Sequence, residues 1–387
     1  MTVPADIAPH VINISQGRFA SDSEVVTTPE TVDLLFDGVL TQALADARAA
    51  GKPLRLLIHA HGGLVDEASA LTRATTHIRW WLLNDVFPLY FVWHTGLLDA
   101  LEQALGGRLN VMKTGLFAAP LSVAPPNDPA LNHAWDSTVE FVSRTFGGQP
   151  LWEAMKTDAE IASRPDGAAY YVAQKLAAFT RANPGDVELH ALGHSAGAIF
   201  LSYFLPATLD LGCAAFEGLY LLAPALRVDQ FNARLAPRLG PSQGISGAVL
   251  FAMSDAFEHA DFCSVGSGLT PYHKSLPYLI YKALERYGPY DLLGLDICFL
   301  QYPDLRKLFG DLSSGSIPAC GEVIWTPTDA ATGRNASAAQ HHGDFDDDKA
   351  TMESIVLRVL GLPDGANICP YPSLPPVLIG PAPPAGP

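Results

Sequence analysis

Ser195 stands in a short segment whose pattern is typical of a reactive hydroxyl. The segment Gly193-His194-Ser195-Ala196-Gly197 matches G-x-S-x-G, and it lies between an expected strand (187–192) and an expected helix (196–205). A nucleophilic serine has to project from a sharp strand-to-helix turn, which small residues two before and two after it permit. The start of the helix adds backbone N–H groups that favour a developing oxyanion. The pattern therefore predicts Ser195 as a nucleophile.

A second glycine-containing turn follows an earlier buried strand, expected at 54–59. It reads His61-Gly62-Gly63-Leu64. Glycines at such a turn let the backbone approach a substrate oxygen closely, so that a main-chain N–H can donate to it. We expect the oxyanion donors to be the N–H of Gly63 or Leu64, together with that of Ala196. The neighbouring residues His61, Gly62 and His194 are expected to border the substrate.

With these two motifs the chain resembles the α/β-hydrolase superfamily, in its lipase and esterase branch. The resemblance covers roughly residues 54–361, with one interruption. It implies a mainly parallel central sheet with helices on both faces. It also implies a catalytic triad that runs serine, acid, histidine along the chain.

The resemblance places the base in the loop between the last expected strand (322–325) and the last expected helix (349–361). That loop contains His341-His342-Gly343, and a serine hydroxyl needs such a histidine to take its proton. We favour His342, because the glycine after it gives the loop freedom to direct the ring, and keep His341 as the alternative. The acidic run 346–348 could cap the following helix.

The acid is expected after the strand at 248–253. Asp255 is the first carboxylate beyond that strand and is our choice for the group that orients the histidine. Glu258 and Asp261 lie in the same loop and remain alternatives.

The wider pattern is one of short apolar strands alternating with helices, which is typical of an α/β protein with a parallel sheet. The rhythm breaks in an insertion that contains Trp135 and Trp152, which we expect to form a helical lid or cap over an apolar pocket. The proline-rich tail is expected to be extended and loosely attached. The expected organisation is a first strand and helix segment (1–53), a core in two parts (54–96 and 166–365), the lid (97–165) and the tail (366–387).

Composition narrows the possible partners. The 387 residues carry a formal net charge of −16, which argues against binding to nucleic acid or to an anionic membrane surface. The five cysteines form no metal-binding or disulfide pattern, and His59 and His61 lack further ligands, so we expect no metal, no cofactor and a reducing, cytoplasmic location. No stable membrane anchor or signal peptide is expected.

Taken together, the sequence favours hydrolysis of a small-molecule carboxylic ester, with a moderately apolar acyl group, through a covalent acyl-enzyme. The same triad would serve an acyltransferase or a hydrolase of amides or thioesters. A non-catalytic scaffold that binds a ligand is the alternative from another class.

Overall fold

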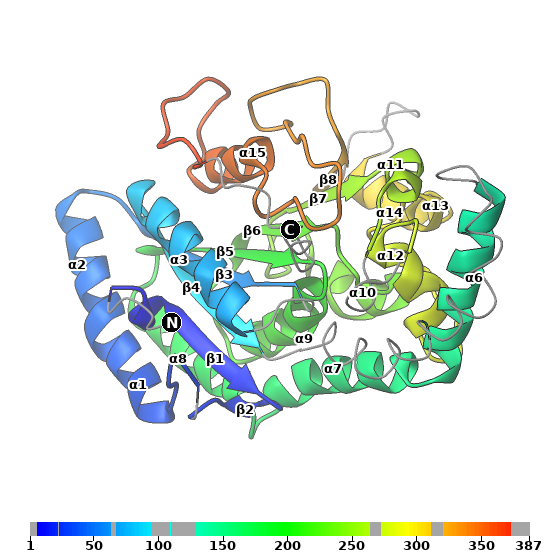
Figure 1. Ribbon diagram of the computed structural model, residues 1–387. Coiled ribbons are helices and arrows are strands. Elements are labelled where there is room, and N and C mark those ends of the chain that lie inside the picture. The colour runs from blue at the N-terminus through cyan, green and yellow to red at the C-terminus, as the bar shows by residue number, and fades with distance from the viewer. Residues whose placement is uncertain are drawn as a thin grey trace, which may run out of the picture.

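The computed structural model describes residues 6–21, 23–62, 67–93, 109, 129–263, 272–310 and 320–372. These residues form an α/β structure around one eight-stranded sheet (Figure 1). The strand order is β2-β1-β4-β3-β5-β6-β7-β8, and every pairing is parallel except that of β2 with β1. The expected α/β class with a mainly parallel sheet is confirmed. The strands are β1 (Val11–Ser15), β2 (Arg18–Phe19), β3 (Leu54–Ala60), β4 (Val86–Trp93), β5 (Val187–His194), β6 (Phe216–Leu222), β7 (Ala248–Met253) and β8 (Gly321–Thr326).

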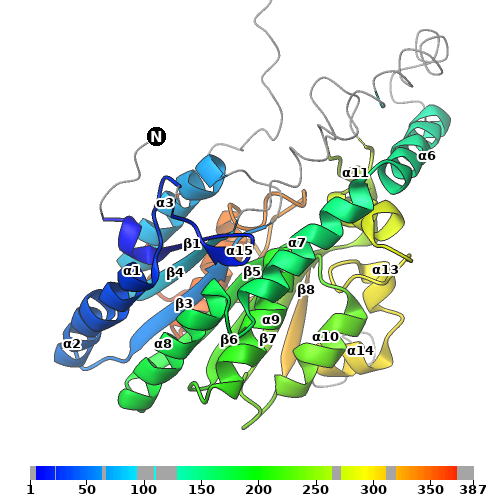
Figure 2. The ribbon, with the colours of Figure 1, turned by 90° about the horizontal axis from the view of Figure 1, so that it is seen from below.

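Helices cover both faces of the sheet, and alternate strand residues supply a core on each side. One layer consists of α1 (Pro29–Leu34), α2 (Thr41–Ala49), α8 (Ala168–Ala182), α9 (Gly197–Asp210) and α10 (Val228–Arg234), and Figure 2 shows it in front of the strands. On the opposite face lie α3 (Glu67–Leu83) and α15 (Lys349–Val359). Because both faces are covered, the central strands are apolar throughout rather than alternating.

The carboxyl ends of β3, β5, β7 and β8 lead into the segments that the sequence singled out for chemistry. In the register of the sheet, Ala60 of β3 pairs with Gly193 of β5, and His194 pairs with Leu222 of β6. The ends of parallel strands meet at one edge of a sheet, so this register brings the serine turn beside the glycine turn after β3.

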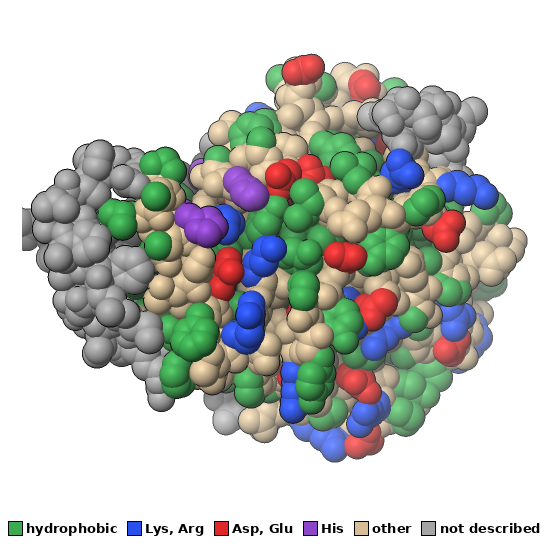
Figure 3. Space-filling view, turned by 90° about the vertical axis from the view of Figure 1, so that its right-hand side faces the viewer, with side chains coloured by type: hydrophobic (Ala, Val, Ile, Leu, Met, Phe, Trp, Pro, Cys, Tyr) green, Lys and Arg blue, Asp and Glu red, His purple; other side chains and the backbone are tan. Residues whose placement is uncertain are grey.

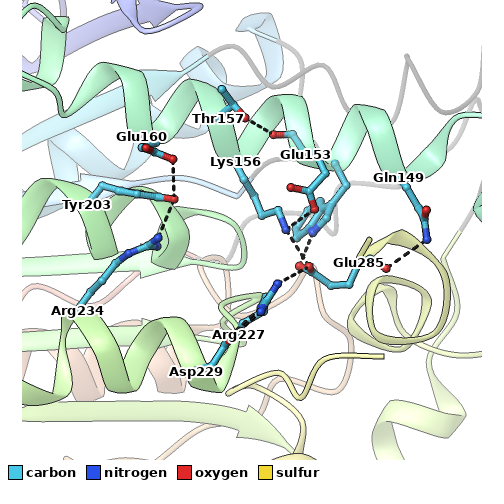
Figure 4. Close-up of polar contacts among 11 residues, drawn as sticks. Gln149, Glu153, Lys156, Thr157, Glu160, Tyr203, Arg227, Asp229, Arg234 and Glu285 are labelled. Atoms are coloured by element: carbon cyan, nitrogen blue, oxygen red, sulfur yellow. Dashed lines mark hydrogen bonds and ion pairs between the residues drawn. The ribbon is translucent and has the colours of Figure 1, made fainter. Parts of the chain in front are cut away.

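The segment expected as a lid contains two long helices in its described part, α6 (Pro129–Thr145) and α7 (Gly148–Ala162). A buried polar cluster fastens α7 to the core (Figure 4). Glu285 accepts hydrogen bonds from Trp152 Nε1 at 2.6 Å and from Lys156 Nζ at 2.8 Å, and Arg227 lies 3.5 Å from the same carboxylate. Since Glu285 and Lys156 are both buried, α7 is a fixed part of the structure, and the expected lid role of 97–165 remains a prediction.

Three segments differ from the sequence-based expectation. The spacing of apolar residues predicts one helix over 31–50, but a π-helical segment (Leu35–Leu40) interrupts it. The sequence likewise predicts a helical stretch over 271–287, of which the described part holds α12 (Leu276–Leu279) and a π-helical turn (Ile280–Leu284). The start of the tail is firmly attached, because Trp80 Nε1 donates to Cys369 O at 2.9 Å and Tyr371 is buried. The remaining short helices are α11 (Asp255–Ala260), α13 (Asp296–Phe299) and α14 (Pro303–Phe309).

The face formed by α6 and α11 to α14 has a mixed surface (Figure 3). Lys and Arg side chains lie among Asp, Glu and apolar side chains there, so the negative charge of the chain does not dominate this face. Among the described helices, none is long and apolar enough to cross a bilayer.

Replacing Glu285 with alanine is expected to lower the free energy of unfolding by about 3–5 kcal/mol, because Trp152 Nε1 would lose its acceptor and the buried Lys156 ammonium would keep only Glu153, at 2.7 Å, as its partner. Urea denaturation monitored by circular dichroism measures this. The matched control is Asp166→Ala, which removes an exposed ion pair with Arg18 and is expected to change the free energy little. Equal losses in the two variants would contradict the structural role of the cluster.

Candidate active site

The turn between β5 and α9 holds Ser195 in a left-handed backbone conformation, with a φ of 52°. Such a conformation is unfavourable for a residue with a side chain and persists only where its surroundings fix it. Here Ser195 N donates to Leu222 O at 2.8 Å, and Ala225 N donates to Ser195 O at 3.1 Å. The end of β6 therefore holds the serine in place from both its amide and its carbonyl.

The two glycines of the motif are explained by close backbone contacts. A Cβ on Gly197 would lie 2.0 Å from Ala60 O, and a Cβ on Gly193 would lie 3.0 Å from Ala198 N. The first distance is far below any permitted contact, so only glycine allows α9 to begin directly against the end of β3. The motif is thus required by packing around the serine as well as by the turn itself.

The histidine expected as a base lies against the serine. His342 Nε2 is 2.8 Å from Ser195 Oγ, although the two residues are 147 positions apart in the chain. Both side chains are buried. A hydroxyl that donates to Nε2 leaves the proton of a neutral imidazole on Nδ1, and no described residue accepts a hydrogen bond from His342 Nδ1.

The environment of His342 disfavours its charged form. Burial and the nearby His194 lower the pKa of His342 to about 3, against an opposing effect of the Asp346 carboxylate. The imidazole therefore stays neutral, and able to accept a proton, at pH values far below those at which a histidine is usually protonated.

The three carboxylates that follow β7 occupy different surroundings. Asp255 begins α11, where its carboxylate accepts from Tyr278 OH and lies 3.8 Å from His259; it contacts neither His341 nor His342. Asp261 follows the end of α11, and its Oδ2 accepts from His342 N at 2.9 Å while its Oδ1 lies 2.8 Å from His341 Nδ1. The structure thus brings Asp261 to the histidine pair and does not bring Asp255 there.

Glu258 is fully buried in the same region. Burial raises its pKa well above the usual range; the nearby Ser275 side chain opposes this, and the carboxylates of Asp261, Asp296 and Asp255 add to it. Neither side-chain oxygen of Glu258 has a hydrogen-bond partner among the described residues. Burial also raises the pKa of Asp261, against hydrogen bonds from the His342 amide and from His341. Of the two, Asp261 has the donors that a carboxylate needs in order to remain ionised.

The groups expected to bind an oxyanion are described in part. Gly63 and Leu64 lie outside the described residues. Gly62 lies against the serine, since a Cβ built on it would be 3.3 Å from Ser195 Cβ. No described residue accepts a hydrogen bond from the N–H of Ala196, which directly follows the serine, so this donor is available to an external acceptor.

His61 and His194, expected near the substrate, are both engaged by the protein. His61 Nδ1 lies 2.6 Å from Gly62 O, and its Nε2 accepts from Trp93 N at 3.2 Å, so this ring braces the turn after β3. His194 Nε2 lies 2.9 Å from His342 O, and His194 Nδ1 lies 3.4 Å from Asp346 Oδ2.

The contact between His194 and Asp346 was not anticipated from the sequence. The sequence predicts a helix cap from the run 346–348, and Asp348 does cap α15 by accepting from Thr351 N at 2.8 Å. Asp346 instead pairs with Arg73 of α3 at 2.8 Å. Although burial opposes its ionisation, the Arg73 guanidinium and the contact with His194 hold the pKa of Asp346 well below its usual range. Asp346 and Asp348 differ in role because Arg73, on a helix far away in the chain, lies beside Asp346. The sequence of the loop does not reveal this.

No group of three or more described His, Cys, Asp or Glu residues is arranged to hold a metal ion. Comparison with protein-family models, with curated proteins and with solved structures finds no match for this chain. The functional interpretation therefore rests on the geometry of the site.

Replacing Glu258 with glutamine is expected to stabilise the protein more at about pH 8 than at about pH 5. A carboxyl whose pKa is raised on folding contributes fully below its unfolded pKa, and that contribution is lost as the pH rises toward the folded pKa. Thermal unfolding of the variant and the wild type at the two pH values measures the difference. The prediction is contradicted if the gain in Tm is equal at both, or larger at the lower pH.

Proposed function

We propose that this protein is a serine hydrolase of the α/β-hydrolase fold that cleaves carboxylic esters through an acyl-enzyme on Ser195. The observation that carries the proposal is the 2.8 Å contact between Ser195 Oγ and His342 Nε2, made by a serine in a left-handed turn. A buried neutral imidazole next to a strained serine at the start of a helix is the arrangement that activates a hydroxyl.

In the proposed reaction, His342 Nε2 takes the proton of Ser195 as Oγ attacks the ester carbonyl carbon. The N–H of Ala196, with a second donor from the turn at Gly63 or Leu64, stabilises the negative charge on the carbonyl oxygen. The tetrahedral intermediate collapses as His342 gives its proton to the leaving alcohol. Water then attacks the acyl-enzyme, with His342 again acting as the base, and releases the carboxylic acid.

We assign Asp261 as the third member of the triad, in place of Asp255. The support is its contact with the backbone of His342, its burial and its donors; Asp255 is engaged by Tyr278 instead. To orient the ring, Asp261 must accept from His342 Nδ1, which requires His341 to release the oxygen that it now contacts. In this proposal His341 competes with His342 for the carboxylate of Asp261, and it is not the base.

Replacing Ser195 with alanine is expected to abolish labelling by a fluorophosphonate probe and to lower ester hydrolysis by about 10⁴-fold or more. The matched control is Ser242→Ala, because Ser242 also has a positive φ, of 66°, but is exposed and lacks a histidine. This control should label like the wild type. Absence of labelling in the folded wild type would overturn the proposal and favour a non-catalytic scaffold.

The class of acyl bond is tested with p-nitrophenyl esters of rising acyl length. A rate of hydrolysis that increases from short to moderately long acyl chains supports an esterase with an apolar acyl site. Labelling by the probe combined with negligible turnover of every ester would instead indicate an amide or thioester substrate, or transfer to another acceptor.

Replacing Asp261 with asparagine is expected to lower kcat by about 10⁴-fold, because a neutral amide cannot stabilise the imidazolium of His342. Asp255→Asn and His341→Ala are the controls, and both should retain activity within a few fold. Single-turnover ester hydrolysis measures all three variants. Loss of activity in D255N with activity retained in D261N would restore Asp255 as the acid, and loss in H341A would make His341 the base.

A further inference from the structure

His194 links the serine turn to the loop that carries the base. Its Nε2 lies 2.9 Å from the carbonyl oxygen of His342, and its Nδ1 lies 3.4 Å from Asp346, which is itself paired with Arg73 of α3. All of these side chains except that of Arg73 are more than nine-tenths buried. The contacts therefore join β5, the 341–348 loop and α3 immediately around the nucleophile.

The two partners of His194 define its protonation. A carbonyl oxygen and a carboxylate can only accept hydrogen bonds, so each ring nitrogen faces an acceptor. A neutral imidazole has one N–H and can satisfy only one of them, whereas an imidazolium satisfies both. The raised pKa of His194 agrees with this: burial opposes protonation, but the charge of Asp346 and the hydrogen bonds that His194 donates to Asp346 and to the His342 carbonyl outweigh it.

We infer that His194 is a positioning residue for the proposed hydrolysis, which as an imidazolium fixes the backbone of His342 relative to Ser195. This inference rests on the proposed function and assigns His194 a part different from the substrate contact expected from the sequence. The base is anchored at two points of its main chain: Asp261 accepts from its N–H and His194 donates to its carbonyl. These two main-chain contacts fix the position from which the ring of His342 reaches Ser195.

The charge of His194 also acts on the base. The ring centroids of His194 and His342 are 5.4 Å apart. The other charged or titratable groups that interact electrostatically with His194 are His59, His61, Arg73 and Asp346. A cation at this distance opposes a second positive charge on His342, and this contributes to the low pKa of the base. His194 thus keeps His342 ready to accept a proton in acidic solution.

Two variants separate the positional and the electrostatic effects. His194→Gln keeps a neutral N–H donor that can reach the His342 carbonyl, whereas His194→Ala removes both the donor and the charge. We expect kcat/KM at neutral pH to fall by about 10- to 100-fold in H194A, because a small displacement of the base is costly, and to recover in large part in H194Q. In both variants the acid limb of the pH–rate profile should move upward by about one unit or more.

The readouts distinguish this inference from the proposed function. Fluorophosphonate labelling of the wild type tests the hydrolase itself and does not depend on His194. If the wild type labels and hydrolyses esters, an unmoved acid limb in H194Q, or unchanged kcat/KM in a folded H194A, overturns the positioning role. If H194A fails to fold, the acid limb of H194Q decides, because a purely structural residue would not shift it.

Discussion

The left-handed backbone of Ser195 is the constraint on which the rest of the structure depends. A conformation of this kind costs about 1–2 kcal/mol, so neighbouring strands must impose it. They do so through the hydrogen bond from Ser195 N to Leu222 O and through the contact of Gly197 with Ala60. Both depend on the register of β3, β5 and β6, so the sheet has to be correctly paired before the hydroxyl can project.

Features that depend on the sheet could be predicted from the sequence. Strands buried on both faces are short apolar runs, and the bounds expected for β7, 248–253, coincide with those observed. Ser195 was predicted from its glycine-flanked turn between a strand and a helix. His342 was predicted from the place that the histidine takes in the α/β-hydrolase family that the chain resembles, and from the glycine after it.

The acid that we propose could not be chosen from the sequence, because the position of each candidate carboxylate depends on how a short helix packs. Asp255 and Asp261 lie at opposite ends of the six-residue helix α11, and both follow β7 closely. Asp255 accepts a hydrogen bond from Tyr278, which lies in a segment where the sequence predicts a much longer helix. Asp261 instead lies against the 341–348 loop. The pairing of Asp346 with Arg73 was hidden for the same reason, since it joins a loop to a helix about 270 residues earlier in the chain.

The burial of Ser195 has a consequence for the outcome of the proposed reaction. Ser195 is only 2% exposed, so both the acyl donor and the molecule that later accepts the acyl group must reach a buried hydroxyl. The triad activates water and an alcohol by the same proton transfer and does not choose between them. Whether the acyl group is hydrolysed or passed on is then decided by access: the second nucleophile admitted to the site determines the product.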